Sequence, residues 1–447
     1  MSDQDLDLDL EDSIVPTPEA VYHTLAGQDA DLASRDKVLF RWNQSFWEAQ
    51  DAEKEESKAF SWLKQNYEDK ATPRLAASCV AAAVMGARPL PGGDSQNVVL
   101  PLKNGYLLID GASGELELTD PAKDAGLTYL IDASFDPNAD APLFHQFLEE
   151  VLPDPETRGW VQEYAGYSLL NDCRFQTAVF FVGSGANGKT TLAEIISKLH
   201  RRTVSMQLNQ LGGFKLSPLL DASLVVVDET PQRIDEQALK SLVSGGLCQV
   251  DRKYRDPISF HPTAKWVILG NALPAVSDQS HGFWRRMPVV PFGRQFDPEE
   301  QDPALVQKII SRELPGVLRW AVAGLVRLVR RGQFPPQSEE MVQAQAAGQK
   351  ESNSVLAWWK DDRAEFDPDF ETPRQSVYTD YKIWCNDFGM SPMGIEKFWS
   401  RLKQTVGGHV AESTMRKIDG QAVRVVPVRL LVDPTRSTQK KVISGRW

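Results

Sequence analysis

Residues 183–191, with the sequence GSGANGKTT, combine glycines, a lysine and two threonines at a spacing that can hold phosphate groups. Glycines let backbone N–H groups converge on phosphate oxygens. In the pattern G-x-x-x-x-G-K-[ST], the lysine reaches the β- and γ-phosphates of a nucleotide and the hydroxyl ligates Mg²⁺. We therefore predict that this loop binds ATP and Mg²⁺, with Thr190 as a metal ligand. The residues expected to bind ATP are Gly183, Ser184, Gly185, Ala186, Asn187, Gly188, Lys189, Thr190 and Thr191.

Two carboxylates follow a second apolar run, SLVVVDET, at residues 223–230. Asp228 stands where a strand would end and can hold Mg²⁺. Glu229 comes next and can polarise the attacking water. An acidic turn after a strand is common by itself. Downstream of a phosphate loop, it indicates nucleotide hydrolysis.

Three more polar residues could complete such a site. Asn271 ends the apolar run 265–270 and can bond a γ-phosphate or water. Arg285 and Arg286 precede another apolar run, and an arginine supplied by a neighbouring subunit can neutralise charge during phosphoryl transfer. Without the other motifs, Asn271 would be an ordinary turn residue and the arginines a surface pair.

The elements around these residues predict an α/β fold. The run TAVFFV at residues 177–182 is typical of a buried parallel strand. Leu192, Ile195, Ile196 and Leu199 recur at helical spacing after the loop. The motif therefore lies between a strand and a helix, as a phosphate loop requires.

In this order, GSGANGKT, VVVDE, VILGN and WRRM resemble the core of superfamily 3 helicases. More narrowly, the array is similar to the helicase half of phage and plasmid primase–helicases, the poxvirus-like branch. Residues 100–118, 144–170 and 239–262 resemble segments of the same branch. The resemblance implies an AAA+ fold with a parallel sheet, a hexameric ring, and ATP hydrolysis at subunit interfaces. It also implies movement on single-stranded and forked DNA.

The resemblance assigns further roles by position. Arg286 is the preferred trans arginine and Arg285 the second choice, with Asn271 as the polar sensor. Lys253, with Arg252, would lie on a loop that points into the central channel and contacts DNA phosphates, although a solvated hairpin face explains the same residues.

The C-terminal part reads as helices followed by a hairpin centred on Asp419–Gly420. This order resembles the winged-helix-like domain of the same branch. Lys397, Arg401, Lys403, Arg416 and Lys417 could meet a DNA backbone. A protein partner is the alternative. Residues 371–447 carry 13 Lys and Arg against 7 Asp and Glu, although the chain's net charge is −12.

The chain begins with six acidic residues among its first twelve, so we expect an acidic, disordered N-terminal arm. The N-terminus has no apolar signal, the chain has no long apolar run, and its four cysteines are scattered, so a cytoplasmic protein without membrane contact is expected. A primase carboxylate cluster is missing before residue 144, so a primase or polymerase would be a separate chain. The expected divisions are an arm (1–20), an N-terminal α+β domain (21–140), a helical collar (141–175), the AAA+ core (176–333), a linker (334–354) and a winged-helix-like domain (355–447).

Four functions fit this pattern. The first is a replicative helicase of a phage, plasmid or other mobile element. The second is an initiator or loader that uses ATP as a switch without unwinding DNA, and it is disfavoured by the intact Glu229 and the arginine. A small-molecule kinase would need a lid and an acceptor site. A defence or interference protein that uses the same ring is a fourth hypothesis, which the sequence does not exclude.

Overall fold

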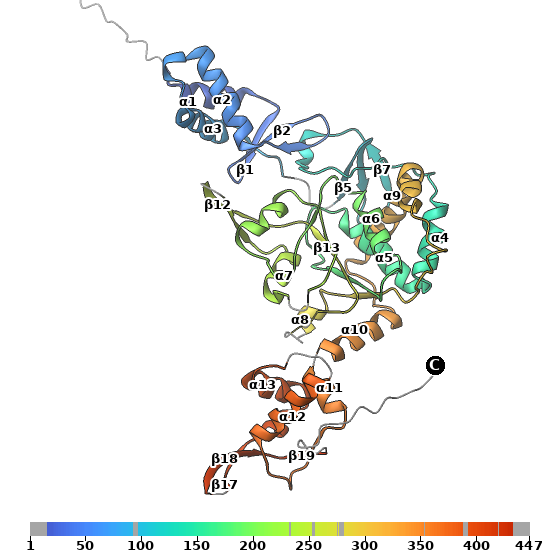
Figure 1. Cartoon of the computed structure of the whole chain (residues 1–447). Helices are drawn as coiled ribbons and strands as arrows, with labels where there is room; N and C mark the ends of the chain where they lie inside the picture. The colour runs from blue at the N-terminus through green and yellow to red at the C-terminus, as the bar shows by residue number, and fades with distance from the viewer. Residues whose placement is uncertain are drawn as a thin grey trace, which may run out of the picture.

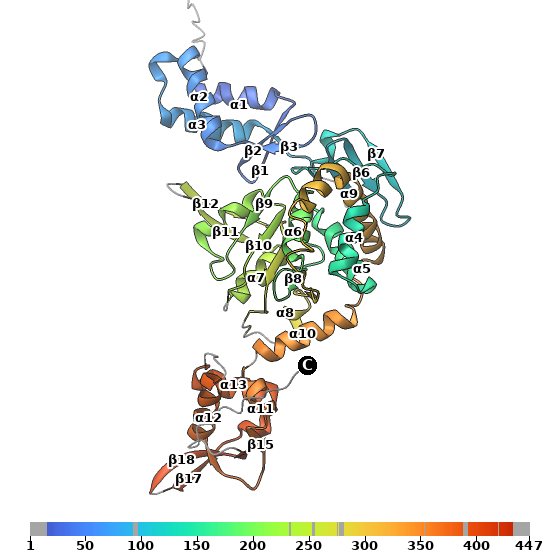
Figure 2. The ribbon, with the colours of Figure 1, turned by 45° about the vertical axis from the view of Figure 1, so that its right-hand side comes forward.

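The computed structural model shows a central α/β body between an N-terminal part and a C-terminal part (Figures 1 and 2). The α/β class predicted from the sequence is confirmed by a five-stranded parallel sheet with helices packed on it. Within the described chain, no helix is long and apolar enough to cross a membrane. The structure describes residues 16–92, 97–231, 234–252, 255–274, 276, 281–352, 354–387, 392–418 and 420–431.

The N-terminal part packs three helices beside a four-stranded sheet of order β3-β2-β1-β4. Side chains of Thr17, Asp51 and Thr72 cap the N-termini of the three helices by accepting backbone N–H bonds. Gly86 allows α3 to approach α1 closely, because a Cβ there would lie 2.2 Å from the His23 carbonyl oxygen. The elements are α1 (Pro18–Gln28), β1 (Leu32–Arg35), β2 (Val38–Trp42), β3 (Trp47–Ala49), α2 (Ala52–Asn66), α3 (Pro73–Gly86) and β4 (Arg88–Pro89).

A small antiparallel sheet and two helices connect this part to the core. The sheet has the order β5-β6-β7, and its buried leucines join the main hydrophobic core. Glu313, which comes from a distant helix, accepts the Leu143 and Phe144 N–H groups and so caps α4. The elements are β5 (Val98–Leu102), β6 (Gly105–Ile109), β7 (Leu116–Thr119), α4 (Pro142–Val151) and α5 (Pro155–Ser168).

The core sheet has the strand order β14-β8-β13-β10-β9, and all its neighbouring pairs are parallel. Its side chains alternate between two cores: Val179 and Phe181 of β8 face one and Phe180 faces the other. The strands are β8 (Val179–Val182), β9 (Thr203–Ser205), β10 (Leu224–Val227), β13 (Lys265–Gly270) and β14 (Val289–Pro291). The other elements are α6 (Lys189–Ser197), η3 (Gly213–Leu220), α7 (Glu236–Val243), the hairpin β11 (Cys248–Arg252) and β12 (Arg255–Phe260), and α8 (His281–Trp284).

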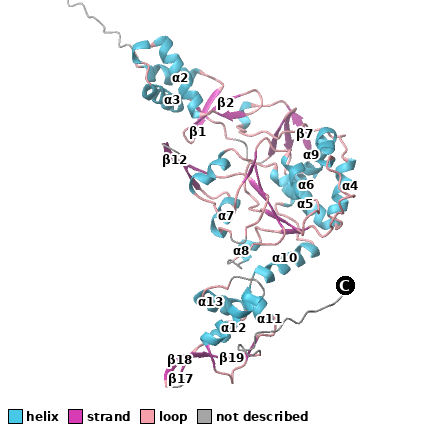
Figure 3. Ribbon diagram, viewed as in Figure 1, coloured by secondary structure: helices cyan, strands magenta, loops and turns pink. Residues whose placement is uncertain are grey.

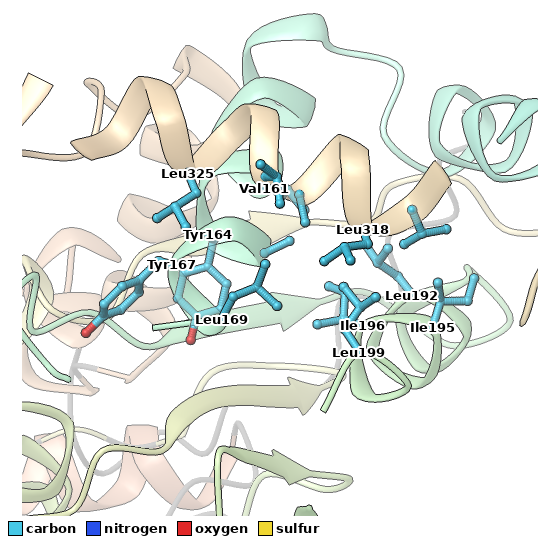
Figure 4. Close-up of a cluster of buried hydrophobic side chains, with 14 of the residues drawn as sticks. Val161, Tyr164, Tyr167, Leu169, Leu192, Ile195, Ile196, Leu199, Leu318 and Leu325 are labelled. Carbon is cyan, nitrogen blue, oxygen red and sulfur yellow. The ribbon is translucent and has the colours of Figure 1, made fainter. Parts of the chain in front are cut away.

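One side of the core is covered by α4, α5, α6 and the long helix α9 (Leu305–Arg331) (Figure 3). Leucines of α9 lie over aromatic residues of α5 and aliphatic residues of α6 (Figure 4). The helices α5 and α9 cross closely because a Cβ at Gly166 would lie 2.5 Å from the Ala321 carbonyl oxygen. Buried Glu163 of α5 pairs with Arg327 and Arg331 of α9 at the same contact.

The C-terminal part has its own hydrophobic core, drawn from residues 355–430. The predicted order of two helices followed by a hairpin is present. Ile418 and Gln421 pair on either side of the predicted turn. Asp419 of that turn lies outside the described residues. The segment expected to be a linker is helical from Glu339, and its Met341 is buried in the main core. The elements are α10 (Glu339–Ser352), α11 (Ser354–Lys360), β15 (Ala364–Phe366), β16 (Thr372–Pro373), α12 (Arg374–Asp387), α13 (Ile395–Thr405), β17 (Thr414–Ile418), β18 (Gln421–Val426) and β19 (Val428–Leu430).

Candidate nucleotide-binding site

The glycine-rich loop joins the carboxyl end of β8 to the amino end of α6, as the sequence predicts. Gly185 and Gly188 have φ of +103° and +84°, a backbone conformation that residues other than glycine rarely adopt. A Cβ at Gly183 would lie 2.4 Å from the Phe292 carbonyl oxygen. The glycines are therefore required by backbone conformation at two positions and by close packing at the third. The first backbone N–H groups of α6 have no acceptor within the helix and lie at this loop, which suits an anion.

The Lys189 side chain is buried, with 6% of its surface exposed. Its ammonium donates to the Gly183 carbonyl oxygen at 2.6 Å and to Asn187 Oδ1 at 2.9 Å. Burial lowers the pKa of Lys189 because the charged form loses solvation. Two neutral oxygens compensate this charge only in part, so an anionic ligand would be attracted to it.

Three backbone or side-chain bonds hold the loop against the rest of the sheet. The Gly183 N–H donates to the Gly270 carbonyl at 3.2 Å, and the Phe296 N–H donates to the Ala186 carbonyl at 2.8 Å. Asn187 Nδ2 donates to the Phe292 carbonyl at 3.3 Å. The loop is thus fixed to the end of β13 on one side and to the chain leaving β14 on the other.

The predicted acidic residues lie at the same edge of the sheet. Strand β10 is separated from β8 by β13 alone, and all three strands are parallel, so their carboxyl ends meet. Asp228 and Glu229 follow β10 and are exposed, as is Asn271 after β13. The Thr230 hydroxyl donates to the Leu269 carbonyl at 2.7 Å and ties the acidic turn to β13. The structure therefore brings the acidic pair and the amide to the edge that carries the loop.

Ser205, at the carboxyl end of β9, extends this edge by one further strand, and its hydroxyl lies 3.4 Å from Asp228 Oδ2. Sequence reasoning missed this serine because the short strand TVS has no distinctive pattern. The described residues contain no group of three or more His, Cys, Asp or Glu side chains that could hold a metal ion by themselves.

Arg285 and Arg286 lie at the opposite end of the strands, at the amino ends of β14 and β8. They precede β14, and the Ala178 N–H at the start of β8 donates to the Arg286 carbonyl at 2.8 Å. Within one chain they are therefore separated from the loop by the length of the strands. The Arg286 guanidinium donates to Ser244 Oγ, the Gly282 carbonyl and Gln176 Oε1 at 2.9, 2.6 and 2.9 Å. Arg285 is exposed.

The predicted DNA-contacting residues are described unevenly. Lys253 lies outside the described residues, and of Arg252 only the backbone, at the end of β11, is described. Arg401 is buried, with 7% of its surface exposed, so its place on the inner side of α13 does not fit a role at an exposed DNA surface. Lys397, Lys403, Arg416 and Lys417 are exposed, and Arg416 forms an ion pair with Glu371 at 2.6 Å.

Two protein families match parts of the chain. Residues 22–153 match the family described as D5 N terminal like, and residues 181–286 match a family of unknown function, DUF5906. The second match begins in β8 and ends at Arg286, so it contains the loop, the acidic pair and the arginines. Neither match covers half of the chain.

Among curated proteins, the chain is similar to viral relatives that are named as helicases. It is 26% identical over 191 residues to "Putative helicase L207/L206" of Acanthamoeba polyphaga mimivirus, an alignment that covers 40% of this chain and 20% of the relative. It is 25% identical over 269 residues to "Putative helicase 022R" of Frog virus 3, covering 54% of this chain and 27% of the relative. The aligned part is thus about a fifth to a quarter of the length of these relatives.

Among solved structures, the chain is similar to one described as the A form apo structure of the NrS-1 C terminal region. The identity is 13%, the TM-score is 0.49, and the match covers 93% of this chain and 100% of the other.

Proposed function

We propose that this chain is an ATP-dependent DNA helicase of the superfamily 3 type, which acts in replication of a phage, plasmid or other mobile element. The observation that carries the proposal is the arrangement at one sheet edge. A phosphate loop with a buried lysine lies two strands from an acidic pair, and an asparagine follows the strand between them. The similarity to viral proteins named as helicases supports the same function.

The site residues fit ATP with Mg²⁺. The Lys189 ammonium is the cation that would meet the triphosphate, and the exposed Thr190 hydroxyl stands in the first turn of α6. Thr190 and Asp228 would hold Mg²⁺, which neutralises phosphate charge. Glu229 would orient the attacking water, and Asn271 would bond the γ-phosphate or that water.

The position of the arginines supports hydrolysis between subunits. Because Arg285 and Arg286 lie at the edge of the sheet opposite the loop, they could reach a nucleotide only in a neighbouring subunit of a ring. Arg286 is held by three partners of its own chain, whereas Arg285 is exposed. We therefore propose Arg285 as the residue that contacts the neighbour's γ-phosphate, with Arg286 fixing the segment. A hexamer is the ring that the resemblance implies.

DNA would be held by two parts of the chain. The β11–β12 hairpin, with Lys253 and Arg252, would contact single-stranded DNA in the central channel. Lys397, Lys403 and Lys417 of the C-terminal part would contact the duplex or fork. A primase or polymerase would act with the helicase in the bacterial or host cytoplasm.

Nucleotide binding by a lysine variant tests the site. Lys189→Ala should abolish binding of a fluorescent ATP analogue, because the buried cation is removed. Lys198→Ala is the matched control, since Lys198 is an exposed lysine at the far end of the same helix. Equal binding by both variants would contradict the assignment of the loop.

A further inference from the structure

Asn187 is a buried residue of the phosphate loop, with 3% of its surface exposed. Both polar atoms of its side chain are used within the protein. Oδ1 accepts from the Lys189 ammonium at 2.9 Å, and Nδ2 donates to the Phe292 carbonyl at 3.3 Å. This orientation of the amide is unambiguous, because an ammonium only donates and a carbonyl only accepts. Each polar atom of the Asn187 side chain therefore already has a partner within the protein.

The Phe292 carbonyl is itself held in place by the sheet. The Phe292 N–H donates to the Val182 carbonyl at 2.7 Å, which continues the pairing of β14 with β8. The Phe292 side chain is buried and packs on Phe181, with ring centroids 5.1 Å apart. Asn187 thus connects Lys189 to a rigid point at the carboxyl end of β14.

Strand β14 has only three residues, and Arg285 and Arg286 stand just before its amino end. A short, buried, paired strand transmits a displacement along its axis more readily than it bends. One end of β14 therefore carries the arginines and the other end carries the bond to Asn187.

We propose that Asn187 is a positioning residue that aims the Lys189 ammonium and links it, through Phe292 and β14, to the arginine segment. This inference rests on the proposed ATP site and adds a role within it. Without a nucleotide, Lys189 stays on Asn187 and Gly183. When a γ-phosphate is present, the third N–H of the ammonium meets it while the bonds to Asn187 and Gly183 persist, and the bond from Asn187 to Phe292 keeps the loop in register with β14.

The test compares ATP with ADP, because only ATP has the γ-phosphate that the Lys189 ammonium would meet, whereas the rest of the loop serves both nucleotides. Asn187→Ala should weaken binding of a fluorescent ATP analogue by about ten-fold or more, the usual effect of losing a hydrogen bond to a charged group. Binding of the ADP analogue should change by less than about three-fold, and kcat should fall with ATP affinity. Lys198→Ala is the control, since Lys198 is exposed at the C-terminal end of α6 and lies outside the loop.

Asn187→Asp is a second variant of the same shape. Its carboxylate still accepts from Lys189 but cannot donate to Phe292, and it holds the ammonium away from the phosphates. ATP affinity should therefore fall more than ADP affinity in this variant too. A double variant with Arg285→Ala should lose less kcat than the product of the two single losses, because both act through β14.

The outcomes separate the two claims. Unchanged kinetics in both Asn187 variants, or equal losses for ATP and ADP, would overturn the positioning role. Strictly multiplicative losses in the double variant would overturn the link through β14. If the unaltered protein binds neither nucleotide, it is the proposed function that fails.

Discussion

Replacing Asp380 with alanine should destabilise the C-terminal part while leaving the nucleotide site intact. Asp380 is fully buried and accepts from Arg363 through Nε at 3.2 Å and Nη2 at 2.7 Å. The Trp358 indole N–H donates to the same carboxylate at 2.8 Å. The alanine variant would leave a guanidinium that is 8% exposed without its counter-charge and an indole N–H without its acceptor.

The structure sets the size of this effect. Removing one member of a buried ion pair costs about 3–5 kcal/mol, because the other charge stays buried and unpaired. A part of roughly 80 residues has a free energy of unfolding of about 4–12 kcal/mol. At about 4–8 °C per kcal/mol for a domain of this size, its Tm should fall by about 12 °C or more.

Calorimetry of the full chain, together with binding of a fluorescent ATP analogue, measures both effects. The Asp380→Ala transition should move alone, with ATP affinity unchanged, because the C-terminal core contains only residues of its own part. Glu371→Ala is the matched control. It breaks the Arg416 pair, whose side chains are 52% and 49% exposed, and should leave the Tm of the C-terminal part nearly unchanged because solvent screens the pair. Equal shifts in the two variants, or loss of ATP binding in Asp380→Ala, would refute the reasoning.

Two further predictions concern the core. Burial lowers the pKa of His200 from 6.5 to about 3, and the nearby charge of Lys265 adds to this effect. Between pH 6.5 and pH 3, His200 is therefore neutral in the folded protein, whereas in the unfolded chain it binds a proton. Relative to His200→Asn, the free energy of unfolding should therefore fall by about 2 kcal/mol between pH 7 and pH 5, measured by urea titration, and parallel pH profiles would contradict this. Gly166→Ala should destabilise the core by about 1–3 kcal/mol, because its Cβ would lie 2.5 Å from the Ala321 carbonyl oxygen and the Leu325 nitrogen. In Gly159→Ala, in the same helix, the new Cβ meets no atom within 4 Å, so this variant should stabilise the protein by up to about 1 kcal/mol. Equal Tm values for the two variants in thermal melts would count against the close packing of α5 on α9.

The sequence predicts the parts of the site that depend on local pattern. The apolar run before Gly183 and the helical spacing after Lys189 place the phosphate loop between β8 and α6, where the structure has it. The hairpin in the C-terminal part is predicted for the same reason, because its turn and its alternation lie in one short segment.

Contacts between distant segments could not be predicted in this way. Asn187 and Phe292 are 105 residues apart, and a backbone carbonyl carries no sequence signal. The preference for Arg286 over Arg285 rests on position in the motif, which carries no information on the three separate segments that supply the hydrogen-bond partners of Arg286. The charge of Arg401 predicts a place at a DNA surface, whereas the residue is buried on the inner side of α13.

ATP hydrolysis and unwinding of a forked duplex, measured together with and without single-stranded DNA, test the central claim most directly. In the unaltered protein, single-stranded DNA should stimulate hydrolysis and the fork should open. Glu229→Gln should bind ATP but neither hydrolyse it nor unwind, whereas Glu194→Gln, at an exposed position of α6, should do both. An unaltered protein that binds ATP and DNA but neither turns over nor unwinds would contradict the account, and an ATP-switched initiator or loader would take its place.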